Sequence, residues 1–325
     1  MVLAVGVVGT VGFGYLALRG IHYGAVWNAL RTSNYWWTLP SLAVLFASVG
    51  AKALRWQILF RADRRPPLRP LTESLLLGLF FNCILPARGG EVARMLDLHR
   101  RAGASRAETS GTIVVERAFD VLGLLLMLFV LLPWLPHIGW LRAAGALAAV
   151  LAVGVAALGA ALARYGERPL VVIISPLRLV GLAPDRIAAA AEALGRGLAG
   201  VRHLSIAAAG FGWTIVSWVV AGISAWLLMP AFGLHLSIAA GMLVVIATTV
   251  AAVIPSLPSS LGVFEAATVV SLRAYHVPDA KALSYALVLH AVGIFPFLLI
   301  GPAVLGLSPR TRIDAAGRVY PTASE

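Results

Sequence analysis

Apolar segments long enough to cross a lipid bilayer recur along the whole sequence, and they restrict its fold more than any other feature. A membrane-spanning helix needs about 20 mostly apolar residues, because the hydrocarbon core is about 30 Å thick. Only 12% of the 325 residues are charged, roughly half the fraction of an ordinary soluble domain. The sequence therefore predicts an all-α, polytopic integral membrane protein. Six segments qualify as full spans: residues 2–18, 37–60, 111–132, 141–163, 204–229 and 282–305.

Two further apolar segments are interrupted by proline. Residues 71–85 are too few to cross the membrane and end at Pro86. Residues 236–254 end at Pro255, Pro258 follows closely, and the next apolar run begins without a polar loop in between. We expect residues 71–98 and 236–272 to form re-entrant hairpins, with these three prolines as structural breaks.

Arginine-rich segments predict the orientation. They fall within residues 61–69, 94–106, 164–202 and 310–318, and the positive-inside rule places all four in the cytoplasm. The first two flank residues 71–85, so both are cytoplasmic only if that segment doubles back. The sequence thus predicts six spans, two re-entrant elements that enter from opposite faces, and both termini inside. An eight-span alternative puts one basic loop outside.

Other local features fit this picture. Residues 2–18 lack a preceding basic region and a clear cleavage site, so we interpret them as a retained helix rather than a signal peptide. Residues 184–202 predict an amphipathic helix at the cytoplasmic interface, with a plain surface linker helix as the alternative. The net charge of +12 does not indicate nucleic-acid binding, because the basic residues lie in loops between apolar runs. Cys83 is the single cysteine and is expected to be a small buried hydrophobe.

Four carboxylates belong to candidate membrane sites: Glu91, Glu116, Asp120 and Glu265. An ionised group at that depth costs on the order of 2.5–3.5 kcal/mol, so it must pair or line a polar cavity. Glu91 follows two glycines at a helix start between Arg88 and Arg94, a pattern suited to a phosphate-bearing head group. The alternative is that Glu91 caps the helix and pairs with Arg94.

Glu116 and Asp120 also have two interpretations. Glu116 and Asp120 share a helix face, and Arg117 can reach Asp120. They form either a polar wall of a head-group pathway or an ion pair that docks the helix. Glu265 follows a break rich in serines, which can satisfy freed backbone groups. Lys52 and Arg55 either snorkel to the interface or pair with Glu91 or Glu116.

The sequence has no recognisable catalytic or cofactor motif. Its seven histidines lack metal-ligand spacing, and no nucleotide-binding or hydrolase signature is present. His290 is the only histidine deep in a predicted span, where a satisfied core histidine is expected. We therefore predict no cofactor, no metal and no enzyme activity. An enzyme acting on lipid head groups through Glu116 and Asp120 stays open as an alternative.

Three stretches together resemble the flippase-like, lysylphosphatidylglycerol-synthase transmembrane family. They are "NCILPARGGEVAR" (residues 82–94), "ERAFDVLGL" (116–124) and "IPSLPSSLGVFEAA" (254–267), and the resemblance covers roughly residues 1–310. "PSS" stands where many relatives have a glycine-rich "PGG". The positions carried over are Asn82, Pro86, Gly90, Glu91, Arg94, Glu116, Arg117, Asp120, Pro258, Gly262 and Glu265.

The resemblance implies a lipid transporter or flippase of the bacterial inner membrane. Its cargo would be a phospholipid, a lipid-linked sugar or a hopanoid-type lipid. Within the sequence, "LPARGGEVA" (residues 85–93) is similar to "LPSSLGVFEAA" (257–267), which suggests an inverted repeat with the head group in a polar cavity between the two re-entrant elements. Residues 1–308 would form one transport domain and residues 309–325 a cytoplasmic tail. No synthase half follows in this sequence, so transport rather than aminoacyl transfer is expected. A scaffold for a separate lipid-synthesis enzyme is the alternative. The predicted substrate-binding residues are Asn82, Arg88, Gly90, Glu91, Arg94, Glu116, Arg117, Asp120, Gly262 and Glu265.

Overall fold

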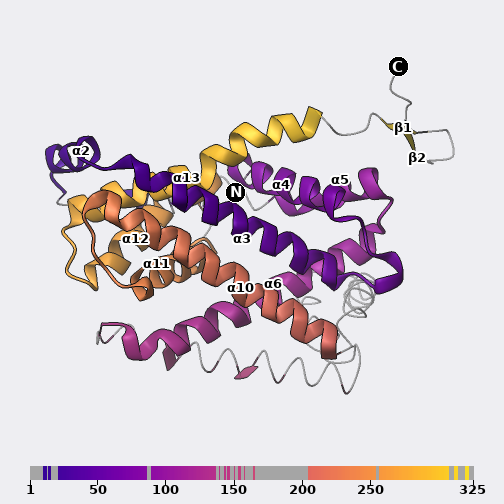
Figure 1. The fold of residues 1–325 in the computed structure, drawn as a ribbon, viewed down its shortest axis with the longest axis horizontal. Coiled ribbons are helices and arrows are strands. Elements are labelled where there is room, and N and C mark those ends of the chain that lie inside the picture. Colours follow the sequence, from indigo (N-terminus) through magenta and orange to yellow (C-terminus); the bar gives the residue numbers. More distant parts are fainter. Residues whose placement is uncertain are drawn as a thin grey trace.

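The computed structural model describes residues 10–12, 14–15, 21–85, 89–136, 204–253, 256–306, 311–313 and 319–321, with isolated positions between 139 and 164. This part of the chain is helical apart from one small ribbon (Figure 1). The helices are α2 (Tyr23–Arg31), α3 (Thr38–Leu59), α4 (Leu68–Ile84), α5 (Gly90–Ala102), α6 (Arg106–Leu131), α10 (Leu204–Leu228), α11 (Ile238–Ala251), α12 (Val263–Arg273) and α13 (Asp279–Gly306). Single 3-10 turns are η1 (Tyr35–Trp37), η2 (Ala62–Arg64), η4 (Leu132–Trp134), η7 (Met229–Phe232) and η8 (Pro258–Ser260), and β1 (Thr311–Ile313) pairs antiparallel with β2 (Val319–Pro321).

Within the described ranges, three helices are long and apolar enough to cross a membrane: Tyr35–Leu59, Ser205–Phe232 and Asp279–Gly306. They correspond to three of the predicted spans. The predicted span 111–132 corresponds to α6, which has 26 residues but carries charged side chains in its first half. The predicted spans 2–18 and 141–163 lie largely outside the described residues. The helix 184–202 and the three residues Pro86, Arg88 and Pro255 lie entirely outside them.

Helices α3 and α10 run antiparallel and pack closely (Figure 1). Serines line the contact between α3 and α10. The Ser41 hydroxyl donates to the Ser224 carbonyl at 2.9 Å, the Ser224 hydroxyl returns a bond to the Ser41 carbonyl at 2.7 Å, and Ser48 donates to the Ser217 carbonyl at 2.8 Å. Small residues let membrane helices approach closely, and the serines allow α3 and α10 to pack along their length.

Helices α4 and α5 form an antiparallel hairpin. At its tip, the Asn82 side chain accepts a bond from the Gly90 N–H at 3.0 Å, and at its open end Arg101 pairs with Glu73 at 2.5 Å. The helices touch through Gly78 and Gly90, since a Cβ on Gly90 would lie only 1.9 Å from the Gly78 carbonyl oxygen. The loops that precede α4 and follow α5 therefore lie at the same end of the molecule. Arg94, which was counted with the second arginine-rich segment, instead lies buried within α5.

Helices α11 and α12 form a second, shorter pair at the other end of the molecule (Figure 1). Its open end packs beside the last turns of α6 and α10. By length, α11 extends about 21 Å and α12 about 16 Å, which is less than the hydrocarbon thickness. The tips of the two hairpins meet in the middle, where the Ser259 hydroxyl donates to the Cys83 carbonyl at 3.1 Å.

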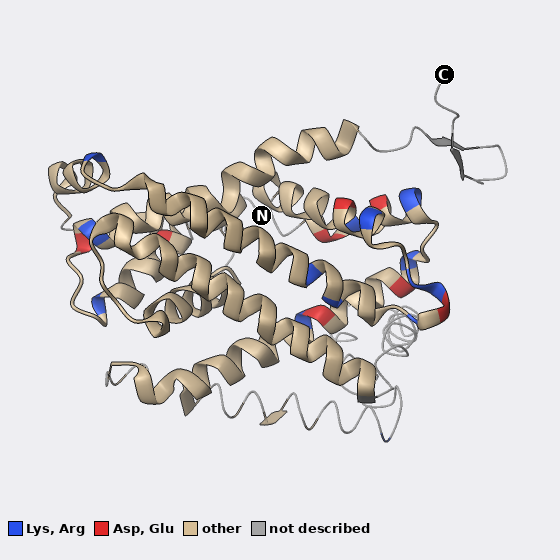
Figure 2. Ribbon diagram, viewed as in Figure 1, with Lys and Arg blue, Asp and Glu red and all other residues tan. Residues whose placement is uncertain are grey.

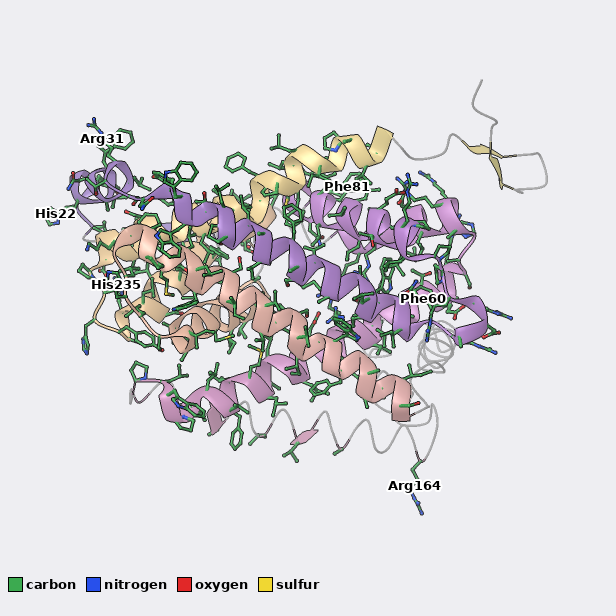
Figure 3. The ribbon with its side chains drawn as sticks, in the orientation of Figure 1. His22, Arg31, Phe60, Phe81, Arg164 and His235 are labelled. Atoms are coloured by element: carbon green, nitrogen blue, oxygen red, sulfur yellow. The ribbon has the colours of Figure 1, made fainter. Side chains whose placement is uncertain are left out.

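The two ends of the molecule differ in chemistry. Many charged residues gather at the end where α4 begins and α5 ends (Figure 2). His22, Arg31 and His235 mark the opposite end (Figure 3). That end exposes large aromatic side chains, which are typical of a membrane–water interface. They are Tyr23, Trp27, Tyr35, Trp36, Trp37 and Trp134. We call the two ends the arginine-rich end and the aromatic end.

Candidate functional site

A buried network of charged side chains links α3, α5 and α6. Its centre is Arg55 on α3, which bonds Glu116 at 2.7 Å and Asp120 at 2.5 Å, both on α6. Arg55 and Glu116 are almost completely buried, at 4% and 1% side-chain exposure. Arg55 therefore pairs with Glu116, one of the two readings open from the sequence, and does not snorkel.

Arg94 of α5 completes the buried part of the network. It bonds the second oxygen of Glu116, and its guanidinium lies 4.0 Å from the centre of the Trp56 ring. A cation over an aromatic face is stabilised where water is excluded. The Trp56 N–H in turn donates to Thr112 at 3.0 Å, which fixes the ring. The first hairpin is thus tied to α3 and α6 by charge.

The network reaches the molecular surface through Arg117. This side chain pairs with Glu91 at 2.7 Å and with Asp120 at 3.1 Å. Arg117 is 41% exposed and Glu91 26%, in contrast to the buried centre. Glu91 pairs with Arg117 rather than with Arg94, so the predicted pairing within α5 is not the one observed. The observed pair instead bridges α5 and α6.

Cations exceed anions in this network. It contains Lys52, Arg55, Arg94 and Arg117, but only the carboxylates Glu91, Glu116 and Asp120. Lys52 lies 5.0 Å from the Trp218 ring, whose N–H donates to Asp120 at 3.1 Å. Within the described part of the chain, the Nε atoms of all three arginines are buried without a hydrogen-bond partner. The network therefore retains one positive charge and unused donors.

A second polar cluster lies at the tip of the α11–α12 hairpin. Glu265 accepts the Gly262 N–H at 2.7 Å through one oxygen, and its other oxygen lies 2.6 Å from Nδ1 of His290 on α13. The second ring nitrogen, Nε2, lies 2.8 Å from the Ser259 carbonyl oxygen. Glu265 thus caps the start of α12 by accepting the backbone N–H of the N-cap residue Gly262.

The backbone at this tip is left-handed at two serines. Ser259 has φ of 58° and Ser260 of 59°, a conformation that costs a non-glycine residue energy. The "PSS" of this sequence therefore adopts the backbone for which a glycine pair is suited. Gly262, at φ 79°, packs so closely on Thr10 that a Cβ would lie 2.7 Å from the Thr10 carbonyl oxygen. Its observed role is close packing.

A third charged cluster closes the open end of the first hairpin. Arg101 pairs with Glu73 of α4 and Asp97 of its own helix, and it donates to the Val304 carbonyl of α13 at 2.8 Å. Ser74 donates to Asp97 at 2.8 Å. These contacts join α4, α5 and α13 at the arginine-rich end, so the role of these side chains is to hold the three helices together.

The structure brings together half of the sequence-predicted site. Glu91, Arg94, Glu116, Arg117 and Asp120 form one network, with Asn82 and Gly90 at its edge. Glu265 and Gly262 lie in the separate hairpin-tip cluster, and Arg88 lies outside the described residues. Within those residues, no group of three His, Cys, Asp or Glu side chains is placed to hold a metal ion.

Sequence reasoning missed several partners of the network. Trp56, Trp218 and Thr214 support its charges, and Thr214 lies 3.3 Å from Arg55. The available signal was the polar face of α10, where Thr214, Ser217 and Trp218 recur at helical spacing. His290 was interpreted only as a core histidine, although it contacts the predicted residue Glu265.

The sequence was compared with models of known protein families and with curated proteins. A family model described as the lysylphosphatidylglycerol synthase TM region matches residues 1–301. The search of curated proteins gave no match. The matched region contains the arginine network and the cluster at the tip of the second hairpin.

Proposed function

Because this chain belongs to the lysylphosphatidylglycerol synthase TM region family, a family tied to membrane lipids, we propose that it is a flippase for a lipid with a phosphate-bearing head group. One observation carries the proposal. A buried network with one excess positive charge and three unpartnered Nε donors opens to the surface at the Arg117–Glu91 pair. Phosphate oxygens are the natural acceptors for such arginine donors.

Arg117 is the proposed first contact of the head group. Its 41% exposure lets it meet a phosphate at the surface, and its pairs with Glu91 and Asp120 can exchange for that phosphate. Glu91, once released, is free to take a cationic or hydroxyl group of the same head group. The acyl chains stay in the bilayer, so only the polar part of the lipid needs a protein path.

The two hairpins are the proposed path. We assign both as re-entrant elements that enter from opposite faces, in the inverted arrangement found in many transporters. Their lengths are below the hydrocarbon thickness and their tips meet at Ser259 and Cys83, which supports this placement. The arginine-rich end would face the cytoplasm by the positive-inside rule, with both termini on that side of a bacterial inner membrane.

Leaflet exchange of labelled phospholipid by the purified protein in liposomes tests the proposal. Arg117→Gln and Glu91→Gln should each lower the exchange rate about tenfold or more, because a charged hydrogen bond contributes roughly 1.5–3 kcal/mol. Arg273→Gln is the matched control. It removes an arginine of similar exposure, 46%, from an ion pair at the aromatic end.

Three results would count against a flippase with this site. Exchange that is unaffected by both site variants would remove Glu91 and Arg117 from the path. Exchange no faster than in protein-free liposomes would remove the activity. Conversion of the lipid into a new chemical species, followed by mass spectrometry, would favour an enzyme acting on head groups.

A further inference from the structure

The Glu265–His290 pair is buried apart from the head-group network. Glu265 is 9% and His290 8% exposed at the side chain, and they join α12 to α13 at the tip of the second hairpin. Among the described residues, the partners of this pair are Gly262, Ser259 and Phe264 rather than members of the arginine network. A carboxylate and an imidazole at this depth are costly, so their hydrogen bonding needs an explanation.

Counting donors and acceptors gives the number of protons on the pair. His290 has an acceptor on each side: the Glu265 carboxylate oxygen at 2.6 Å from Nδ1 and the Ser259 carbonyl oxygen at 2.8 Å from Nε2. A carbonyl oxygen only accepts, so Nε2 carries a proton. The short contact at Nδ1 needs a second proton, on either Nδ1 or Glu265. The observed geometry therefore holds two protons on the pair.

We propose that Glu265 and His290 form a proton-binding site whose second proton holds the tips of the two hairpins together. Loss of one proton to solvent leaves a carboxylate and a neutral imidazole with a single N–H. That N–H can serve Glu265 or the Ser259 carbonyl, and the other contact becomes acceptor against acceptor. One of the two hydrogen bonds to His290 is then lost.

The loss reaches the first hairpin through Ser259. Its carbonyl is held by His290, while its hydroxyl donates to the Cys83 carbonyl of α4. Its left-handed backbone, at φ 58°, persists only while neighbours hold it. The single remaining N–H stays with the Glu265 carboxylate, because an ionised acceptor forms the stronger hydrogen bond. Deprotonation therefore breaks the bond to the Ser259 carbonyl, releases a strained turn from its anchor and weakens the contact between the tips.

The surroundings favour the protonated pair. The Phe264 ring stacks on the His290 ring at 4.2 Å. Burial favours the pair with two protons, which is net neutral, over the pair with one proton, which carries a negative charge. Helix α11 has no titratable side chain, and α4 contributes the Cys83 thiol nearby. The remaining titratable groups on α2, α4, α12 and α13 lie elsewhere: at the aromatic end Tyr23, Arg31, Arg273, Asp279 and Lys281, at the arginine-rich end Arg69 and Glu73, and against α10 Tyr285.

Cys83, the single cysteine of the chain, reports on this contact directly. The purified protein in nanodiscs would be labelled with N-ethylmaleimide at a series of pH values from about 5 to about 8. His290→Gln is the comparison, because its amide can still donate to Ser259 but cannot titrate. The ratio of labelling rates, wild type over variant, cancels the pH dependence of the thiol itself.

We expect this ratio to rise severalfold with pH as the tips separate. A flat ratio would overturn the proton site. Ser259→Ala provides a second test that leaves the pair in place: it should label rapidly at every pH, and slow, pH-dependent labelling identical to the wild type would also overturn the proposal.

Coupling of this site to lipid movement rests on the proposed flippase function. A pH gradient across the liposome should accelerate lipid exchange by the wild type and leave His290→Gln unaffected. Wild-type protein that exchanges no lipid under any gradient would refute the flippase function alone, since the Cys83 comparison still decides the proton site.

Discussion

At the scale of single residues, two serines adopt a left-handed backbone conformation that glycine would adopt with less strain. Ser259 uses its hydroxyl to bond Cys83, so its side chain has a role that glycine could not supply. Ser260 has the same backbone conformation without that bond. The two positions should therefore respond differently to glycine.

Ser260→Gly should stabilise the protein. Glycine adopts φ near 59° without the penalty of a side chain, so we expect the unfolding free energy to rise by about 1 kcal/mol. Thermal unfolding in detergent measures the change. Ser110→Gly, inside α6, is the control and should lower the stability by about 0.5 kcal/mol. An equal loss in both variants would show that the turn is not strained.

Several side-chain partners could not be predicted from the sequence. Glu116 and Asp120 could be placed on one helix face because they are close in the chain. Their partner Arg55 lies 61 residues from Glu116, and side-chain type alone left it between snorkelling and pairing. Glu265 and His290 are 25 residues apart on different helices, so periodicity within either helix could not join them.

At the scale of elements, the first hairpin depends on close contact between its helices. A Cβ on Gly90 would lie 1.9 Å from the Gly78 carbonyl oxygen and 2.7 Å from the Asn82 side chain. A backbone oxygen cannot move aside as a flexible side chain can. The helices must separate to admit even one methyl group.

Gly90→Ala should therefore destabilise the hairpin. Overpacking of this kind costs about 1–3 kcal/mol, measured as a lower midpoint of thermal unfolding. Gly50→Ala is the matched control, since a Cβ at this helical position in α3 meets nothing within 4 Å. We expect the control to be neutral or slightly stabilising, because alanine favours a helix. Equal effects in the two variants would contradict the close contact.

The longer helices were largely predictable from the sequence, and the elements that were not predicted share a physical reason. Long apolar runs located α3, α10 and α13, and prolines located the ends of the hairpins. The 3-10 turns and the short helix α2 were not predicted, because their residues have neither the length nor the apolar content of a span. Helix α2 instead presents Tyr23 and Trp27 at the surface of the aromatic end.

At the scale of the whole molecule, loop charges predicted that residues 61–69 and 94–106 lie on one side of the membrane, although Arg94 of the second segment lies buried in α5. The Arg101–Glu73 pair places the two segments at one end. Single cysteines at Asp63, Arg106 and Lys281, each in a Cys83→Ala background, test the membrane orientation. An impermeant maleimide on intact cells should label only Lys281→Cys.

Permeabilised cells provide the control for that labelling, since all three cysteines should then react. Labelling of Asp63→Cys but not Arg106→Cys in intact cells, or the reverse, would mean that α4 and α5 cross the membrane as an ordinary span. Labelling of both from outside would reverse the orientation.

The depth of His290 has a consequence for membrane voltage. His290 is the twelfth residue of α13, about 17 Å along the helix from Asp279, which is roughly half of the hydrocarbon thickness. A proton arriving from the aromatic end would cross about half of the potential drop, and a full crossing is worth about 2.3 kcal/mol per 100 mV. Each 100 mV would then change proton occupancy by several fold. In this fold a fixed histidine, rather than a moving charged helix, would let the electrical potential of the cell act on the contact between the hairpins.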